Sequence, residues 1–429
     1  MLDEFEYFTP TVVQSAVVSE YDEMVSSINA INPNTADALS VMEFKIPGAS
    51  DLYRDLNNSY LMLKMKLVKA DGTAAADDVA AAPTNLPLHS LFSNVSITLC
   101  GKEITEKDSL YPYRAYLETL LSHSPDTLNN RFILEGWAKD QAARMDTIAL
   151  DATANSGFLA RQKIVKGGRT FTLVGRPHGD LFHQPLDIPP NCEIVMKLTP
   201  SPTAFSLMEA AAGTHKYVCL DAKMFVRTKR VCPELVLAHK EMLQKSNMRF
   251  PLNRVTVTKT GIAAGFKSTS ITLNFASQLP KRVFVAFVKN TAATGTRSEN
   301  PFNFQHFGIK QMSIKVNGVS IPATRLDMDF DTKDVQRAYL NTLASLGLDQ
   351  GDRSIDLKLD DFQDGYTIFG FKVAPGPIDG TILSAHNTTG RIEVEMTFQD
   401  SLTNNLDMIV FAETPAVLEI DKLNCVTLV

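Results

Sequence analysis

"RAYLETLLS", at residues 114–122, returns almost unchanged as "RAYLNTLAS" at residues 337–345. Seven of the nine positions are identical, and the two copies lie 223 residues apart in a chain of 429. A phrase that occurs once in each half of a chain is typical of an internal repeat. The pair therefore predicts two related structural units, one in each half.

The sequence before each copy extends the repeat. "SNVSITLCGKEI" (residues 93–104) precedes the first copy, and "KQMSIKVNGVSI" (residues 310–321) precedes the second. Matching residues in these two segments are 217 positions apart, whereas those in the repeated nonapeptide are 223 apart. The connection between segment and nonapeptide is therefore six residues longer in the second unit. Agreement interrupted by one loop-sized change indicates an old duplication. The structural repeat positions are Ser96, Ile97, Gly101, Arg114, Tyr116 and Leu117 in the first unit, and Ser313, Ile314, Gly318, Arg337, Tyr339 and Leu340 in the second.

Each unit has the pattern of a strand, a tight turn and a helix. "VSITLCGKEI" (residues 95–104) alternates apolar and polar residues around a glycine, which predicts a half-buried strand and a turn. The following segment changes to helical spacing and places on one face Tyr113, Leu117, Leu120 and Leu121. In the second unit we expect Leu340 and Leu343 to keep this face and Gly347 to end the helix.

Short alternating runs dominate the rest of the chain, separated by turns rich in glycine, proline and asparagine. In the first half they are "YLMLKMKLV" (60–68), "RTFTLVG" (169–175), "CEIVMKL" (192–198) and "KYVCLDAKMFVR" (216–227). In the second half they are "RVTVTK" (254–259), "SITLNF" (270–275), "RVFVAFV" (282–288), "RIEVEMTF" (391–398) and "DMIVFAE" (407–413). Many short strands with long connections and few helices predict an all-β protein of two tandem jelly-roll sandwiches.

The repeat also suggests where the units begin and end. We expect an N-terminal arm at residues 1–40, a first jelly roll at 41–232, a linker at 233–250 and a second jelly roll at 251–429. The linker contains "ELVLAHKEML", which has the pattern of a short helix. The arm has no sequence counterpart in the second unit, and we expect it to become ordered against a neighbouring molecule.

Composition narrows the class of protein. A net charge of −6 and a pI near 5.8 argue against a protein that coats nucleic acid, and the short basic cluster "RTKR" (residues 227–230) is more typical of a solvated edge. The chain starts without an apolar signal segment and has no apolar run long enough to span a membrane. Five cysteines with no C-x-x-C pair predict reduced thiols and synthesis in the cytoplasm or nucleus.

Several stretches together resemble a known family. "LHSLFSNVSITLCGKEI" followed by "YPYRAYLETLLS" is the most specific, and "GFLARQ" and "GRPHGDLFHQP" complete the first half. "LPKRVFVAFV", "NPFNFQHFGI", "GYTIFGF" and "VLEIDK" follow in the second half, so the resemblance covers nearly the whole chain. In these segments the chain resembles the double jelly-roll major capsid proteins of eukaryotic DNA viruses, in particular the hexon-like proteins of the Maverick/Polinton and adintovirus branch.

The resemblance implies a structural function in a virion. Such proteins assemble as homotrimers with a pseudo-hexagonal outline, and the trimers pack as capsomers of an icosahedral shell. The expected partners are neighbouring capsomers and penton and minor capsid proteins, with no sequence-specific nucleic-acid binding and no small-molecule substrate. The resemblance implies neither an enzymatic activity nor a cofactor.

Metal-binding patterns are weak. His178, Asp180 and His183 in "HGDLFH" could hold a metal, but hydrogen-bonded loop or interface histidines fit this spacing better. "DMDFDTKD" (residues 327–334) has the D-x-D-x-D spacing of a calcium loop but lacks the glycine and glutamate that an EF-hand requires. We expect an acidic, solvated connection there, which contains the six-residue difference. The sequence predicts no metal site.

Enzymatic patterns are also missing. The sequence contains no H-x-H pair, nucleophile elbow, phosphate-binding loop or dinucleotide fingerprint. Trp137 is expected to anchor a core or an interface. Arg114 and Arg337 occur in both copies, and we expect each to pair with a carboxylate of its own chain and fix its helix to its barrel, rather than reach across a subunit contact.

Two other functions remain open. A two-barrel hydrolase would need converging acid and base groups, and the sequence nominates none. A glycan-binding protein would be secreted, and the sequons at Asn57, Asn94 and Asn387 would then be occupied.

Overall fold

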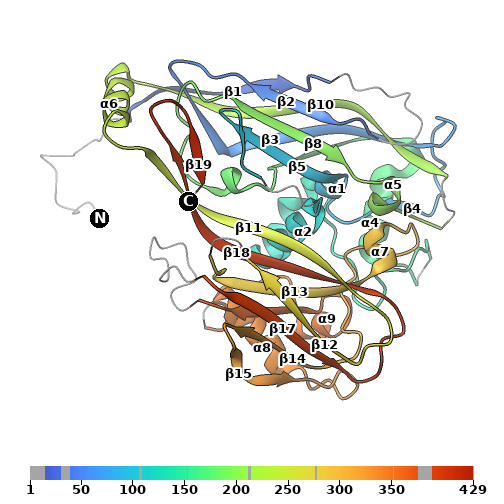
Figure 1. Cartoon of the computed structure of the whole chain (residues 1–429). Helices are drawn as coiled ribbons and strands as arrows, with labels where there is room; N and C mark the ends of the chain where they lie inside the picture. The colour runs from blue at the N-terminus through green and yellow to red at the C-terminus, as the bar shows by residue number, and fades with distance from the viewer. Residues whose placement is uncertain are drawn as a thin grey trace, which may run out of the picture.

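The computed structural model describes residues 15–29, 39–105, 109–151, 153–210, 214–275, 278–350, 352–374 and 389–428. Figure 1 shows two β-sandwich units, with the first above the second and short helices between them. None of the helices in these ranges has the length and apolar character of a membrane span.

The first unit consists of two four-stranded antiparallel sheets that enclose one apolar core. One sheet has the order β1-β10-β3-β7, with β1 at Val17–Ser26, β3 at Leu52–Lys69, β7 at Thr170–Gly175 and β10 at His215–Val231. The other has the order β2-β8-β5-β6, with β2 at Met42–Ile46, β5 at Phe92–Leu99, β6 at Lys102–Glu103 and β8 at Ile194–Pro200. A two-stranded ribbon joins β4 (Ala81–Pro83) to β9 (Leu207–Glu209).

The two main sheets of the second unit repeat the strand order of those of the first. Its first sheet has the order β11-β18-β13-β16, with β11 at Met248–Ile262, β13 at Arg282–Lys289, β16 at Ile368–Lys372 and β18 at Leu406–Ile420, and β19 (Val426–Leu428) pairs with β18. Its second sheet has the order β12-β17-β14-β15, with β12 at Ser268–Asn274, β14 at Ile309–Val316, β15 at Val319–Asp327 and β17 at Arg391–Phe398. Eight strands in two sheets form a jelly roll, so the prediction of two tandem jelly rolls is confirmed.

Residues 17–26 of the predicted arm form β1, a strand of the chain's own first sheet, although they have no sequence counterpart in the second unit. β1 pairs antiparallel with β10 of the same chain, and it holds the place in the first unit that β11 holds in the second. Its side chains are mostly exposed, and its acidic residues pair with basic ones: Arg227 Nε lies 2.7 Å from Asp22 Oδ1, and Arg54 pairs with Glu23. The sheets therefore begin at residues 17 and 248, whereas the sequence suggested 41 and 251. The rest of the predicted arm, residues 1–14 and 30–38, lies outside the described ranges.

The matched segments form equivalent hairpins. β5 and β6 are joined by Cys100 and Gly101, and β14 and β15 by Asn317 and Gly318, with positive φ at all four residues. Two consecutive residues with positive φ are typical of the tight turns that suit twisted hairpins. β15 is nine residues long and β6 only two, so the second strand of this hairpin is longer in the second unit.

Short helices fill the connections. Those of the first unit and the linker are α1 (Pro87–Ser90), α2 (Tyr111–Ser122), α3 (Pro125–Asn130), α4 (Ser156–Val165), α5 (Thr203–Ser206) and α6 (Pro233–Leu243). Those of the second are α7 (Asn290–Thr294), α8 (Gln336–Leu346) and α9 (Leu359–Gln363). Short 3-10 turns occupy Phe132–Glu135, Lys166–Gly168 and Asp180–His183.

The two helices that carry the repeated phrase differ in burial. Nine of the twelve residues of α2 are buried, including Tyr116 and Leu117. α8 rests on β16 through Ala338, Thr342 and Ser345. Leu340 is 55% exposed, so its predicted place on the buried face is wrong. The small side chains let α8 lie close to the sheet on a different face, where Thr342 Oγ1 bonds the carbonyl oxygen of Ile368. Gly347 ends α8 at a φ of 72°, as predicted.

The two cores share residues across the units. The core of the first unit is completed from the second unit by Phe250, Leu252, Leu418, Ile420 and Val426, which come from β11, β18 and β19. The core of the second unit continues into α2 of the first. β11 and β18 run between the two units (Figure 1), so each contributes to both cores.

Candidate functional site at the junction of the two units

α2, which carries the first copy of the repeated phrase, lies at the junction and contacts β11 and β18. Tyr116 stacks on Phe302 of the second unit, with ring centroids 4.2 Å apart and planes inclined by 4°. Tyr113 meets Phe302 edge-on at 5.8 Å, and Trp137 lies 5.5 Å from Tyr116. Aromatic pairs in these geometries add to the free energy of apolar burial. Trp137, expected to be an anchor, therefore belongs to a cluster that joins the units.

Arg114 ties α2 to the opposite unit through a carboxylate. Its Nη2 lies 2.5 Å from Asp180 Oδ1 and its Nε lies 3.2 Å from Glu118 Oε1. Asp180 Oδ1 also accepts a hydrogen bond from the Val255 backbone N–H on β11, at 3.3 Å. Charge-assisted bonds of this kind are among the stronger ones in proteins.

Arg337, the equivalent residue in the second unit, makes different contacts. Its guanidinium donates to the carbonyl oxygens of Arg325 and Thr324 at 2.7 and 2.8 Å, on the exposed side of α8. The expected carboxylate partner is thus present for Arg114, whereas Arg337 uses backbone carbonyls. Tyr339, the equivalent of Tyr116, donates to the Leu357 carbonyl oxygen within its own unit.

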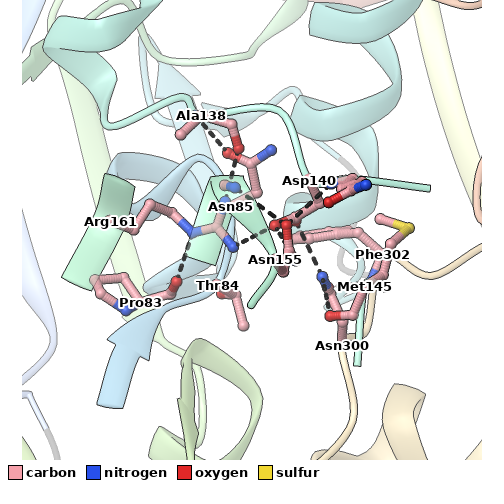
Figure 2. Close-up of polar contacts among 12 residues, drawn as sticks. Pro83, Thr84, Asn85, Ala138, Asp140, Met145, Asn155, Arg161, Asn300 and Phe302 are labelled. Carbon is pink, nitrogen blue, oxygen red and sulfur yellow. Dashed lines mark hydrogen bonds and ion pairs between the residues drawn. The ribbon is translucent and has the colours of Figure 1, made fainter. Parts of the chain in front are cut away.

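A buried ion pair lies at the centre of a polar network beside the aromatic cluster (Figure 2). Arg161 Nη2 lies 2.7 Å from Asp140 Oδ1, and neither side chain is exposed. Arg161 also donates to the carbonyl oxygens of Pro83 and Ala138 at 2.8 and 2.7 Å. Asn155 Nδ2 donates to Asp140 Oδ1 at 2.8 Å. A fully buried ion pair requires such additional hydrogen bonds because water is excluded from it.

The same network reaches the second unit. Asn300 Nδ2 donates to Asp140 Oδ2 at 3.1 Å, and the Tyr366 hydroxyl donates to the Asp140 carbonyl oxygen at 2.8 Å. The neighbouring Lys139 lies 2.8 Å from Asp356 Oδ1 and 2.7 Å from Asp361 Oδ2. Two consecutive residues of the first unit therefore bind four side chains of the second, which fixes the position of one unit on the other.

A group of histidines and glutamates lies on the other side of α2. His89 Nε2 is 3.0 Å from Glu135 Oε2, and His178 Nδ1 is 2.6 Å from Glu118 Oε2. Burial lowers the pKa of His178 well below its ordinary value. Burial raises the pKa of Glu118, but the charge of Arg114 and the hydrogen bond with His178 outweigh this and lower it below its ordinary range.

The other candidate binding segments from the sequence, the acidic loop and the basic cluster, are engaged in contacts within the chain. Asp329 Oδ1 accepts the backbone N–H groups of Asp331 and Thr332, so this acidic loop is held by its own turn. The basic cluster at residues 227–230 is paired with acidic side chains, since Lys229 Nζ lies 2.7 Å from Asp55 Oδ2 and Arg230 Nε lies 3.0 Å from Asp51 Oδ2. Asn387, one of the three sequons, lies outside the described ranges.

The sequence did not indicate the residues of the buried network. Asp140 and Asn300 lie in irregular connections, and Arg161 lies on the short α4. A connection has no periodic pattern that would mark a buried position. The one available signal is proximity to Trp137, a residue type that usually needs a large buried pocket.

The chain is similar to several known proteins. No protein-family model matches the chain. An uncharacterized protein of Caenorhabditis elegans is 25% identical over 407 residues, which cover 90% of this chain and 93% of that protein.

Several solved structures of viral proteins are similar over nearly their whole length. A chain of the Sputnik virophage aligns with a TM-score of 0.64 at 10% identity, over 99% of this chain and 91% of that one. The Faustovirus major capsid protein aligns with a TM-score of 0.59 at 9% identity, over 96% and 92% of the two chains. The mavirus major capsid protein aligns with a TM-score of 0.51 at 12% identity, over 100% and 95%. At such low identity, the likeness establishes a shared double jelly-roll fold.

Proposed function

We propose that this chain is a major capsid protein that assembles as a homotrimer, the pseudo-hexagonal capsomer of an icosahedral shell. The observation that carries the proposal is the duplication itself: two jelly rolls of identical strand order, joined by a buried network and shared cores. Three such chains present six similar units around one axis. The major capsid proteins of Faustovirus and mavirus, which share the fold, support this function.

The contact within the chain supplies a pattern for the contact between chains. Inside the chain, α2 of the first unit packs against β11 and β18 of the second. The topological equivalents are α8 in the second unit and β1 and β10 in the first. If the same packing is repeated between molecules, α8 of one chain covers β1 and β10 of the next. A head-to-tail contact of this kind generates a ring when its rotation closes.

The exposed side chains support this arrangement. Leu340 on α8 is 55% exposed, whereas its equivalent Leu117 on α2 is 1% exposed. On β1, Val18 is 67% exposed and Met24 is 55% exposed. Both surfaces that the repetition would bring together therefore carry apolar side chains in the single chain. Burial of such side chains between subunits is the usual source of stability in obligate assemblies.

The proposed function extends to the shell. The trimers would pack against neighbouring capsomers and against penton and minor capsid proteins, and the protein would act as a structural component of the virion after synthesis in the reducing cytoplasm or nucleus. The role is non-enzymatic and uses neither a cofactor nor a small-molecule substrate. The fixed geometry of the junction fits this role, because a lattice needs units that keep one orientation.

Sedimentation velocity on the purified chain tests the proposal. We expect a species of three times the 47.2 kDa chain mass, with a hexagonal outline by negative-stain electron microscopy. Leu340→Glu places a charge in the proposed contact and should shift the protein toward monomer. Leu423→Glu is the matched control, because Leu423 is 75% exposed in the turn between β18 and β19. A wild-type chain that stays monomeric at high micromolar concentration would contradict the trimer.

A further inference from the structure

The histidines beside α2 belong to a larger set of metal-binding side chains than the sequence suggested. Asp180, which the sequence grouped with His178 and His183, is instead engaged by Arg114 and the Val255 backbone. The structure brings His89 from α1 and Glu135 from a 3-10 turn up to His178. All three residues are buried, and one ligand atom from each lies within 4.8 Å of the others.

The distances approach those of a tetrahedral metal site. With metal–ligand bonds of about 2.0–2.1 Å, two ligand atoms of a tetrahedral zinc ion lie about 3.3 Å apart. His89 Nε2 and Glu135 Oε2 are already 3.0 Å apart. The rings of His89 and His178 meet edge-on with centroids 4.6 Å apart. The ligand atom of His178 lies within 4.8 Å of the other two, so the three atoms must draw together when an ion binds.

The outer hydrogen bonds orient both rings. The Tyr111 hydroxyl lies 2.8 Å from His89 Nδ1, which leaves Nε2 toward Glu135. Glu118 Oε2 lies 2.6 Å from His178 Nδ1, and the Nε2 of this ring has only a 3.4 Å approach to Thr119 Oγ1. A histidine that binds a metal commonly gives its other ring N–H to a carboxylate or another oxygen acceptor, which fixes the ring and its tautomer.

Charged side chains of both signs surround the histidines. Three carboxylates lie around α2, those of Glu118, Glu135 and Asp180. Arg114 is paired directly with Glu118 and Asp180, and the guanidiniums of Arg176 and Arg131 lie nearby. Glu135, one of the proposed ligands, is a buried carboxylate, and a bound divalent ion would offset the cost of burying its charge.

We propose that His89, Glu135 and His178 bind a divalent transition-metal ion of the zinc class, with Tyr111 and Glu118 as the groups that orient the two imidazoles. Two nitrogen ligands and one carboxylate suit Zn²⁺, and a water completes the tetrahedron. The ion would connect α1, the 3-10 turn at Phe132–Glu135 and the loop of His178, which surround α2. Its role is structural and does not depend on the proposed capsid function.

Metal analysis of the purified full-length chain tests the proposal. After incubation with Zn²⁺ and removal of free ions, we expect one zinc per chain by mass spectrometry and a higher thermal midpoint than in chelator-treated protein. Co²⁺ in its place should give the visible absorption bands of tetrahedral nitrogen and oxygen ligation. His89→Ala and Glu135→Gln should each abolish the bound zinc. Glu135→Gln keeps the side-chain shape, so it reports on the site even if His89→Ala fails to fold.

The control is His123→Gln. His123 lies at the end of α2, where its Nδ1 lies 3.2 Å from the Thr119 carbonyl oxygen and its ring meets Phe132 edge-on, and it is not one of the proposed ligands, so this variant should bind zinc like the wild type. Zinc that persists in Glu135→Gln would lie elsewhere, for example on the cysteine thiols, and would overturn the proposal. A wild-type chain that retains no zinc would do the same.

Discussion

Substitution of Asp140 by asparagine tests whether the buried network holds the two units together. The carboxylate receives three side-chain donors, from Arg161 and Asn155 on Oδ1 and from Asn300 on Oδ2. Neither asparagine side chain can exchange the positions of its amide oxygen and nitrogen without losing hydrogen bonds. Asn155 Oδ1 accepts backbone N–H groups of Gln141 and Gly157, and Asn300 Oδ1 accepts that of Phe302. An amide at position 140 must therefore point its NH₂ group at a donor.

The magnitude follows from these contacts. Asp140→Asn leaves the fully buried Arg161 with the carbonyl oxygens of Pro83 and Ala138 but without a counter-charge. Removal of one partner of a buried pair costs about 3 kcal/mol at the lower end of the usual range. The hydrogen bond lost at Asn300 adds about 1 kcal/mol. We expect the free energy of unfolding to fall by about 4 kcal/mol.

Urea unfolding measures this loss, with all variants compared at one protein concentration. Trp137 is the sole tryptophan and lies 5.5 Å from the Tyr116 ring, so its fluorescence reports on the junction directly. Lys45→Ala is the control, because Lys45 and Glu193 form a pair whose side chains are 48% and 43% exposed. Its loss should stay below about 1 kcal/mol. An equally small loss for Asp140→Asn would refute the view that the network fixes the junction.

Three further experiments compare equivalent residues of the two units and test the pH dependence caused by one histidine. Arg114→Met should lower the free energy of unfolding by about 3 kcal/mol, because it leaves Asp180 and Glu118 without their guanidinium. Arg337→Met should lower it by less than about 1 kcal/mol, because among the described residues Arg337 bonds only backbone carbonyl oxygens. Similar losses for the two variants in urea unfolding would contradict the asymmetry between the units. Gly101→Ala and Gly318→Ala should each lower the free energy of unfolding by about 1–2 kcal/mol in the same assay. The cost comes from backbone strain, because φ is +81° and +85° at these glycines and an added Cβ would meet no other atom within 4 Å. Unchanged stability would show that the turns adopt another backbone conformation. Burial lowers the pKa of His306, whose Nδ1 accepts the Gly308 N–H. The unfolded chain therefore takes up this proton first, and stability falls as the pH drops below about 6.5. His306→Phe retains an aromatic ring stacked on Phe330 but removes the titrating imidazole. The urea midpoint of this variant should therefore fall less between about pH 7 and 5 than that of the wild type. An equal fall in both proteins would show that other groups cause the pH dependence.

The sequence predicts the strands well where one face is buried. β10 and β17 alternate between buried and partly exposed positions, and their runs were found within a few residues of their observed ends. β1 was missed because its side chains are exposed on both faces, so no alternation marks it. Its place in the sheet comes instead from backbone pairing with β10 and from charges far along the chain, such as Asp22 with Arg227.

The junction was harder to predict for a physical reason. A repeat shows that two segments have a common origin and a common local structure, and α2 and α8 are indeed both helices. It does not show what each helix touches. Leu117 and Leu340 occupy equivalent positions, but one lies against the other unit and the other faces outward. Burial of this kind depends on how the two units meet, which no local pattern contains.

The shared cores have a consequence for how the protein is made. The first unit is synthesised first, but its core also needs Phe250 and Leu252 from β11 and then Leu418, Ile420 and Val426 from β18 and β19. A ribosome-bound chain that stops short of these residues leaves an apolar gap in the first sandwich. The first sandwich therefore cannot be completed until residues up to Val426 have been synthesised. Prematurely terminated chains would be unstable, and cellular proteases could remove them before they enter an assembly.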